Sequence, residues 1–339
     1  MKRIVYSNPG TPDVMKIVEV DDLTAGDDEV VINVQRAGIN FADLLMRMGL
    51  YRPLPKFPFT PGYEVSGIIE KTGKNVEHLK AGDRVMALSQ IGGYAQQICL
   101  NSNQVFLLSD SIGFDEAAAM PVTYVTAYHM LVHLGNIKQG DTVLIHSAAG
   151  GVGTAAAQIA KAMGAGKIFG TASASKSKFL ESTGVIPIDR ESDFLQFVRD
   201  NTDRRGVMHI LDPIGGDTLK KSYRALCSGG RLYSFGFSSA APKKKFSRIT
   251  AFSHLIKSPK FKPIQMIGAN KAVFGVHMGT LNDNELMKSH SIELLKMLEE
   301  KIIEPIVDSV FRFEDCIDAH NHIHQRKNIG KVLLDFSNK

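Results

Sequence analysis

The chain has 339 residues, of which 44% are hydrophobic and 22% are charged, and its formal net charge is +5. These values exclude a disordered or fibrous chain and leave room for two globular domains with separate cores. The charge is too modest to indicate nucleic acid as a partner, and no apolar run reaches the ~20 residues needed to cross a bilayer. Because the chain opens without a signal peptide and has only three widely spaced cysteines, we expect a cytoplasmic protein.

The first 108 residues contain short β-like segments between turns rich in Gly, Pro and Asp. The clearest segments are Val30–Val34, Glu64–Ile69 and Arg84–Leu88. Short strands at this spacing are typical of a small barrel or sandwich, which we therefore expect for the N-terminal part of the chain.

A strand, a glycine-rich turn and a helix are expected in residues 142–162. The apolar segment Val143–Ser147 indicates a buried strand, and Thr154–Ala162 is typical of a helix. Between them, Ala148, Gly150 and Gly153 keep the spacing of the G-x-G-x-x-G motif, with alanine in place of the first glycine. Glycines let a pyrophosphate come close, and the N–H groups of a helix N-terminus attract it. We predict a dinucleotide site rather than an ordinary loop, provided that Ala148 keeps a negative φ.

The segment after the next predicted strand indicates which dinucleotide binds. NAD sites usually carry an acid about 20 residues past the glycines, and this acid binds the ribose 2′-hydroxyl. Here the strand Lys167–Thr171 is followed by Ser173 and Lys176, and no Asp or Glu occurs between residues 161 and 180. Hydroxyl groups and an ammonium suit a 2′-phosphate, so we predict NADPH. Arg190 is a second candidate cation, although acids flank it.

Strand-like and helix-like segments alternate from about residue 115 to residue 300, and this pattern predicts a parallel sheet with helices on both faces. The tail of the chain ends in a strand-like segment, Lys331–Phe336. The predicted strands of the alternating part are Val143–Ser147, Lys167–Thr171, Val207–Leu211, Arg231–Phe235 and Ala272–His277.

Three histidines alternate near the end of the chain, at His320, His322 and His324. On a helix, the first and the last would share one face. Because no cysteine or third ligand with the proper spacing accompanies them, we expect a solvated helix face and no metal site.

The segment 243–262 joins seven cations with large apolar residues and contains no acid. This composition suits an anionic membrane surface. The alternative is a lid or a loop beside a dimer interface, with its cations in solvent and its apolar side chains packed on the catalytic domain.

These features together resemble the zinc-free medium-chain dehydrogenases/reductases of the quinone oxidoreductase type, over nearly the whole chain. Two segments, Gly170–Lys176 and Phe274–Gly279, resemble the vesicle amine transport protein branch more narrowly. The blocks that carry the broader resemblance are residues 37–51, Pro61–Glu64, Ala81–Val85, Ala148–Gly153, Asp212–Gly216 and Asn328–Leu334.

The resemblance implies an α/β fold with two domains. Residues 1–122 and 301–339 would form a GroES-like, β-rich catalytic domain, and residues 123–300 a Rossmann domain, a doubly wound parallel sheet that binds NADPH. Relatives pair into homodimers through the last strand of that sheet, here around Ala272–His277. Zinc-dependent relatives carry a His where this chain has Tyr63, and their structural zinc needs four clustered cysteines that it lacks, so the resemblance implies no metal.

The resemblance also implies roles for single residues. Asn40 and Tyr51 would be catalytic and donate to the oxyanion that forms on a reduced quinone. Packing of an ordinary loop aromatic on Pro53 and Pro55 is the alternative for Tyr51. Cofactor contacts are implied for Asn40, Thr126, Gly150, Gly151, Val152, Gly153, Ser173, Lys176, Arg190, Phe235, Gly236, Phe274, Gly275 and Asn328.

We therefore predict a zinc-independent, NADPH-dependent oxidoreductase that reduces quinones or related conjugated carbonyls by hydride transfer. Two alternatives stay open. The spacing of Asn40, Asp43 and Tyr51 also resembles that of zinc-free 2-enoyl thioester reductases, and Leu45 replaces a Tyr found in bacterial quinone reductases. The basic segment 243–262 instead suggests an NADPH-binding protein at a lipid surface with little turnover.

Overall fold

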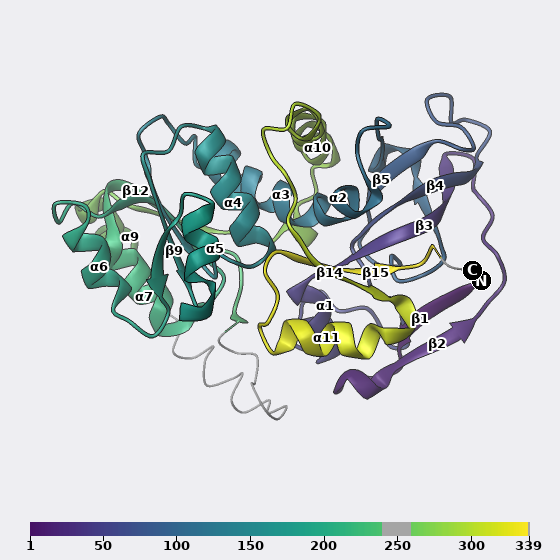
Figure 1. Ribbon diagram of the computed structural model, residues 1–339, viewed down its shortest axis with the longest axis horizontal. Helices are drawn as coiled ribbons and strands as arrows, with labels where there is room; N and C mark the ends of the chain where they lie inside the picture. The colour runs from purple at the N-terminus through teal and green to yellow at the C-terminus, as the bar shows by residue number, and fades with distance from the viewer. Residues whose placement is uncertain (239–258, 338–339) are drawn as a thin grey trace. The chain divides into compact units, whose positions relative to one another are not determined.

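The computed structural model describes residues 1–238 and 259–337, and the chain divides into two compact units (Figure 1). Unit 1 comprises Met1–Val125 and Asp283–Lys339, and unit 2 comprises Thr126–Asn282. Helix α10 (Asn284–Glu299) belongs to unit 1, whereas the sequence-based boundaries at residues 123 and 300 assign it to the cofactor domain. Helix α3 (Pro121–Tyr128) contains the point between Val125 and Thr126 where unit 1 ends and unit 2 begins in the sequence.

Unit 1 is built on β-strands. Its larger sheet has the order β14-β15-β3-β4-β5-β7, with β6 paired to β3, and β1 and β2 form a separate antiparallel pair. All neighbours in the larger sheet are antiparallel except β14 and β15. The strands are β1 (Lys2–Tyr6), β2 (Met15–Glu19), β3 (Glu29–Ile39), β4 (Glu64–Thr72), β5 (Arg84–Leu88), β6 (Gln97–Asn101), β7 (Val105–Leu107), β14 (Val307–Arg312) and β15 (Lys331–Asp335).

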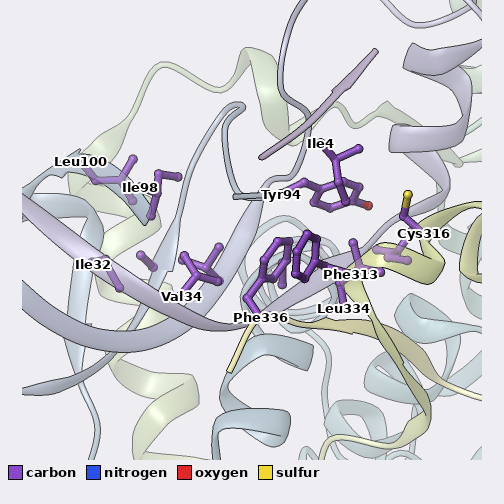
Figure 2. Packing of buried hydrophobic residues seen from close by; sticks show 14 of the residues in the cluster. Ile4, Ile32, Val34, Tyr94, Ile98, Leu100, Phe313, Cys316, Leu334 and Phe336 are labelled. Carbon is purple, nitrogen blue, oxygen red and sulfur yellow. The ribbon is translucent and has the colours of Figure 1, made fainter. Parts of the chain in front are cut away.

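The C-terminal tail completes the core of unit 1. Strand β15 pairs with the long central strand β3, and its apolar side chains are buried (Figure 2). Phe336, just after the strand, stacks on Phe313 with 4.9 Å between the ring centroids. Leu334 joins the same cluster, together with Ile32 and Val34 of β3. Burial of these side chains from both ends of the chain holds the tail in the unit.

Helices packed on the sheet position the residues of unit 1. Small side chains at Ala117–Ala119 let α2 lie close to β3, β4 and β15. The helices of unit 1 besides α10 are α1 (Phe41–Arg47), α2 (Phe114–Ala119) and α11 (Cys316–His324). The described residues of both units also form the short 3₁₀ turns η1 (Pro12–Val14), η2 (Ser102–Gln104), η4 (Ala174–Lys176), η6 (Met278–Thr280) and η7 (Phe313–Asp315), and the π-helix η3 (His129–Leu134).

Unit 2 is a parallel six-stranded sheet in the order β10-β9-β8-β11-β12-β13. The order reverses at β8, and α/β sheets of this kind bind ligands outside the carboxyl ends of the strands at such a reversal. The strands are β8 (Thr142–His146), β9 (Lys167–Ala172), β10 (Ile186–Asp189), β11 (Val207–Asp212), β12 (Leu226–Ser234) and β13 (Ala272–Gly275). The helices are α4 (Gly151–Ala162), α5 (Ser177–Ser182), α6 (Phe194–Asp200), α7 (Gly216–Ala225) and α9 (Pro263–Ala269).

The fold class predicted from the sequence is confirmed, since a β-rich unit accompanies a doubly wound parallel sheet. Strand β12 begins five residues before the predicted segment Arg231–Phe235. The prediction missed this start because glycines, which are typical of a turn, lie inside the strand. Among residues 1–238 and 259–337 we find no helix with the length and apolar character needed to cross a membrane.

Candidate functional site

Most of the cofactor residues predicted in unit 2 lie at one edge of its sheet. Because the strands are parallel, their carboxyl ends meet there. Thr126 differs, since it lies buried in α3. The residues at the edge are Gly150, Gly151, Val152 and Gly153 after β8, Ser173 and Lys176 after β9, Arg190 after β10, Phe235 and Gly236 after β12, and Phe274 and Gly275 at the end of β13.

The turn after β8 presents backbone N–H groups. Helix α4 begins at Gly151, and its first helical bond runs from the N–H of Thr154 to the carbonyl of Gly150 at 2.8 Å. The three N–H groups before Thr154 lie in the first turn, where helix donors have no partner within the helix. A Cβ on Gly153 would lie 2.5 Å from the carbonyl oxygen of Ser147, so glycine is needed for this close approach. Such a cradle suits a pyrophosphate.

The alanine in the glycine motif is accommodated without backbone strain. Ser147, and not Ala148, is the residue of this turn with a positive φ, which is 56°. Ala148 itself is fully buried, and its N–H donates to the carbonyl of Thr171 at 3.0 Å. The condition set by the sequence motif is therefore met.

The residues predicted to hold a 2′-phosphate follow two neighbouring strands. Ser173 precedes η4, which ends at Lys176, directly after β9. The N–H of Arg190 donates to the carbonyl of Ala172, the last residue of β9, at 2.8 Å. The hydroxyl and both cations thus come from the same corner of the sheet.

The acids beside Arg190 have other partners. The guanidinium of Arg190 pairs with Glu191 at 3.1 Å in an exposed position. The carboxylate of Asp189 accepts the N–H of Glu191 at 3.0 Å, within its own turn. Because an exposed ion pair contributes little, the contact with Glu191 is easily exchanged for a phosphate.

The residues predicted beside the nicotinamide include one glycine that packing requires. The N–H of Phe235 donates to the carbonyl of Asp212 at 3.2 Å. A Cβ on Gly236 would lie 2.8 Å from the carbonyl oxygen of Pro213, so glycine lets the chain run close to the turn after β11. Phe274 stacks on buried Tyr233 with 5.5 Å between ring centroids, which fixes its ring against the sheet.

A buried polar cluster in unit 1 holds the amide of Asn40. Lys331 Nζ donates to Oδ1 of Asn40 at 2.6 Å and also to Oε1 of Glu64. Asn40 Nδ2 donates to the same carboxylate oxygen at 2.7 Å, and the other oxygen accepts the N–H of Val122 at 2.7 Å. Buried charges are stable only when they are paired and hydrogen-bonded, and this cluster meets both conditions. The orientation of Asn40 is therefore fixed, with one Nδ2 hydrogen left to donate.

Sequence reasoning missed Glu64 and Lys331 as members of the site. Both are almost fully buried, with 0% and 3% of their surface exposed. A signal was present, because Lys331 opens an apolar strand and Glu64 opens another. A charged residue at the start of a buried strand requires a partner of opposite charge.

Asp43 caps helix α1 next to the cluster. Its Oδ2 accepts the N–H of Asn40 at 2.7 Å, and its side chain is fully buried. Burial raises the pKa of Asp43 to about 7, although the Asn40 hydrogen bond and the charge of Lys331 act in the opposite direction. The carboxyl group therefore titrates near neutral pH while it holds the backbone of Asn40.

Tyr51 packs against the core of unit 1 beside Tyr63. Their ring centroids are 6.4 Å apart in an edge-to-face arrangement, and the hydroxyl of Tyr63 donates to Sδ of Met46 at 3.4 Å. Burial raises the pKa of both phenols, so both stay protonated at neutral pH. Tyr51 can thus donate a proton or a hydrogen bond.

Asn328 stands in a braced loop before β15. Its Nδ2 donates to the carbonyl of Gly330 at 2.8 Å. Asp308 accepts the N–H of Ile329 at 2.7 Å through one oxygen and pairs with His322 at 2.8 Å through the other. These contacts set the position of the loop and of Lys331 after it.

The alternating histidines do not share a solvated face, so that expectation was wrong for His320. This ring is fully buried, edge-on to Tyr6 and Tyr94, because α11 packs on the core of unit 1. His322 instead pairs with Asp308. Among residues 1–238 and 259–337, no group of three or more His, Cys, Asp or Glu side chains is arranged to hold a metal ion.

Two protein-family models match the chain. The alcohol dehydrogenase GroES-like domain matches residues 26–134, and the zinc-binding dehydrogenase domain matches residues 151–292.

Individual proteins and solved structures are similar to the chain over more than nine tenths of its length. The synaptic vesicle membrane protein VAT-1 homolog of Rattus norvegicus is 38% identical over 312 residues, which cover 91% of this chain and 77% of that protein. The structure of Escherichia coli quinone oxidoreductase complexed with NADPH is 30% identical, with a TM-score of 0.87 and coverage of 99% and 100%. The CurK enoyl reductase is 28% identical, with a TM-score of 0.86 and coverage of 98% of each chain.

Proposed function

Because the chain belongs to the quinone oxidoreductase family of medium-chain dehydrogenases/reductases, in its VAT-1-like branch, we propose that it is an NADPH-dependent reductase of quinones or related conjugated carbonyls. One observation carries the proposal. The glycine turn at the reversal point of the sheet adjoins a corner with Ser173 and Lys176 where an NAD site carries an acid.

The residues of unit 2 fit the proposed cofactor. The N–H groups of Gly151–Gly153 would bind the pyrophosphate, and Ser173, Lys176 and Arg190 would bind the 2′-phosphate. We keep Thr126, Asn40 and Asn328 as proposed contacts as well. Phe235, Gly236, Phe274 and Gly275 would flank the nicotinamide, which supplies a hydride when bound.

The acceptor gains a hydride on carbon and a proton on oxygen. In this mechanism Tyr51 gives the proton, because its raised pKa keeps the phenol protonated until an oxyanion forms beside it. The remaining Nδ2 hydrogen of Asn40 donates to the same oxyanion, and Glu64 with Lys331 fixes its direction. We propose that no zinc takes part, since Tyr63 stands where a His ligand would be needed.

A panel of acceptors tests the function. Oxidation of NADPH and NADH is followed by absorbance with a naphthoquinone and with an enoyl thioester at equal concentrations. We expect turnover of the quinone and a preference for NADPH. Turnover of the thioester alone would replace the proposal by alkene reduction, which the similarity to the CurK enoyl reductase and the spacing of Asn40, Asp43 and Tyr51 also support.

We also propose a homodimer. Within the described chain β13 is the last strand of its sheet, and an edge strand offers backbone groups to a second copy. Light scattering at several concentrations tests this proposal, and a monomer throughout would overturn it.

A lipid surface is the second candidate function. Residues 243–258 of the basic segment 243–262 lie outside the described part of the chain. Helix α9, just after the segment, leaves Ile264 and Ile267 exposed at 73% and 74%. Co-sedimentation with anionic vesicles at low and high salt tests this candidate. No binding at low salt would remove it.

A further inference from the structure

A chain of buried polar side chains crosses unit 2 next to the carboxyl edge of its sheet. It runs through Thr171 of β9, His146 of β8, Ser222 of α7 and Asp212 of β11, none of which is more than 3% exposed. His146 Nδ1 lies 3.0 Å from Oγ1 of Thr171, and its Nε2 lies 2.9 Å from Oγ of Ser222. Ser222 Oγ lies 2.8 Å from Oδ2 of Asp212.

The hydrogen bonds between these four side chains have one consistent direction. Ser222 has a single hydroxyl hydrogen, and it goes to Asp212 Oδ2 or to the carbonyl of Thr218 at 2.9 Å, both of which can only accept. The oxygen of Ser222 must then accept from His146, so Nε2 carries the imidazole hydrogen. Nδ1 is left as the acceptor for the hydroxyl of Thr171. Burial lowers the pKa of His146, which agrees with a neutral ring.

Both ends of this series of hydrogen-bonded side chains reach backbone N–H groups of turns at the edge of the sheet. At one end, Oγ1 of Thr171 accepts the N–H of Ser147 at 3.3 Å. Ser147 is the residue with a φ of 56°, a conformation that costs a non-glycine residue energy unless its surroundings hold it. At the other end, Oδ1 of Asp212 accepts the N–H groups of Ile214 and Gly215 at 2.8 and 2.9 Å.

We infer that His146, as the Nε2–H tautomer, is a positioning residue that ties the glycine turn after β8 to the turn after β11. Through Thr171 it holds Ser147 in the left-handed conformation that directs the N–H groups of the turn toward the pyrophosphate. This role rests on the proposed function, because the turn has to bind a dinucleotide. An apolar core residue at 146 would remove the acceptor for the hydroxyl of Thr171 and the donor to the oxygen of Ser222.

A matched set of threonine variants tests the inference. Thr171→Val removes the hydroxyl and keeps the shape, and Thr171→Ser restores it. Thr202→Val is the control, because that buried hydroxyl likewise donates one hydrogen bond, to the carbonyl of Val198, and accepts one backbone N–H, from Gly206 just before β11. We expect T171V to raise the Kd for NADPH by about three- to tenfold, T171S to restore it, and T202V to leave it unchanged.

The tautomer of His146 is measured in the same protein by long-range nitrogen-15 NMR of its histidines, with His146→Gln to assign the signal. The expected pattern is a protonated Nε2 and an unprotonated Nδ1 at pH 7. A protonated Nδ1 would overturn the direction assigned to these hydrogen bonds. If T171V and the wild type have the same Kd for NADPH, the positioning role alone is overturned. If the wild type binds neither NADPH nor NADH, the proposed function is overturned as well.

Discussion

Ala148 and Gly170 share one small space where β8 and β9 end. A Cβ on Gly170 would lie 2.6 Å from the Cβ of Ala148, closer than two carbon atoms can come. The usual motif has a glycine at the position of Ala148. In this chain the methyl group stands in the turn, and the glycine that makes room for it stands in the neighbouring strand. The two residues therefore act as one unit of packing.

This relationship predicts that Gly170→Ala destabilises unit 2 by about 1–3 kcal/mol through overpacking. The double variant A148G/G170A should recover part of the loss, because Val185 Cγ1 also lies 2.6 Å from the added Cβ. Urea denaturation followed by circular dichroism measures each free energy of unfolding. Gly268→Ala is the control, since a Cβ at that helical position meets no atom within 4 Å. Equal losses in the single and the double variant would contradict the shared space.

The grouping of the predicted cofactor residues at one edge of the sheet follows from signals that are local in the sequence. Strand, turn and helix follow one another in residues 142–162, and the corner at Ser173 and Lys176 comes directly after the next strand. The elements of a parallel sheet place such residues together automatically. The chain order alone is therefore enough to bring the predicted residues to one edge of unit 2.

The cluster in unit 1 could not be predicted in the same way. Asn40 and Lys331 are 291 residues apart, and Glu64 and Lys331 are 267 residues apart. Only the folded tail, which brings β15 beside β3, pairs them. The burial of His320 was missed for a similar reason, since a polar helix pattern does not reveal that tyrosines from distant segments enclose the ring.

The choice of dinucleotide predicts the effect of Lys176→Ala. Loss of a charge-assisted hydrogen bond should raise the Kd for NADPH by roughly tenfold or more and leave the Kd for NADH unchanged, because NADH lacks the 2′-phosphate. Titration calorimetry measures both constants. Lys178→Ala is the control, two residues further along the chain and exposed. A parallel loss of both dinucleotides would place Lys176 away from the 2′-phosphate.

The proton donor predicts the effect of Tyr51→Phe. If the phenol gives its proton in the rate-limiting step, kcat should fall about 10²- to 10⁴-fold, with little change in the Kd for NADPH. Stopped-flow absorbance of NADPH under single-turnover conditions separates this step from binding. Tyr63→Phe is the comparison variant, because it keeps the adjacent ring and removes a hydroxyl that bonds to Met46 and to Tyr51, so a much smaller fall in kcat is expected. Equal rates in Y51F and the wild type would leave Tyr51 as a packing residue.

The buried cluster predicts strong coupling between Lys331 and Glu64. Lys331→Met leaves the carboxylate of Glu64 buried without its cation and should destabilise the protein by about 3–5 kcal/mol. Addition of Glu64→Gln should restore much of this, because the neutral amide can accept the N–H of Val122 and donate to Oδ1 of Asn40, whose own amide turns over once Lys331 is gone. A double-mutant cycle from urea denaturation gives the coupling energy. Additive losses would mean that the two side chains act independently.

The raised pKa of Asp43 predicts how stability changes with pH. The pKa rises from 3.8 to about 7 through burial, so the folded protein keeps a proton that the unfolded chain releases. The contribution of Asp43 is therefore fully present below pH 4 and is lost as the pH rises through 7, by roughly 4 kcal/mol in total. In Asp43→Asn the oxygen of the amide still accepts the N–H of Asn40, and no group titrates at this position. Urea denaturation of both proteins from pH 4 to pH 8 gives the difference in their free energies of unfolding, in which the other carboxyl groups cancel. This difference should move in favour of D43N as the pH rises, whereas parallel curves would show that Asp43 is ionised in the folded protein throughout that range.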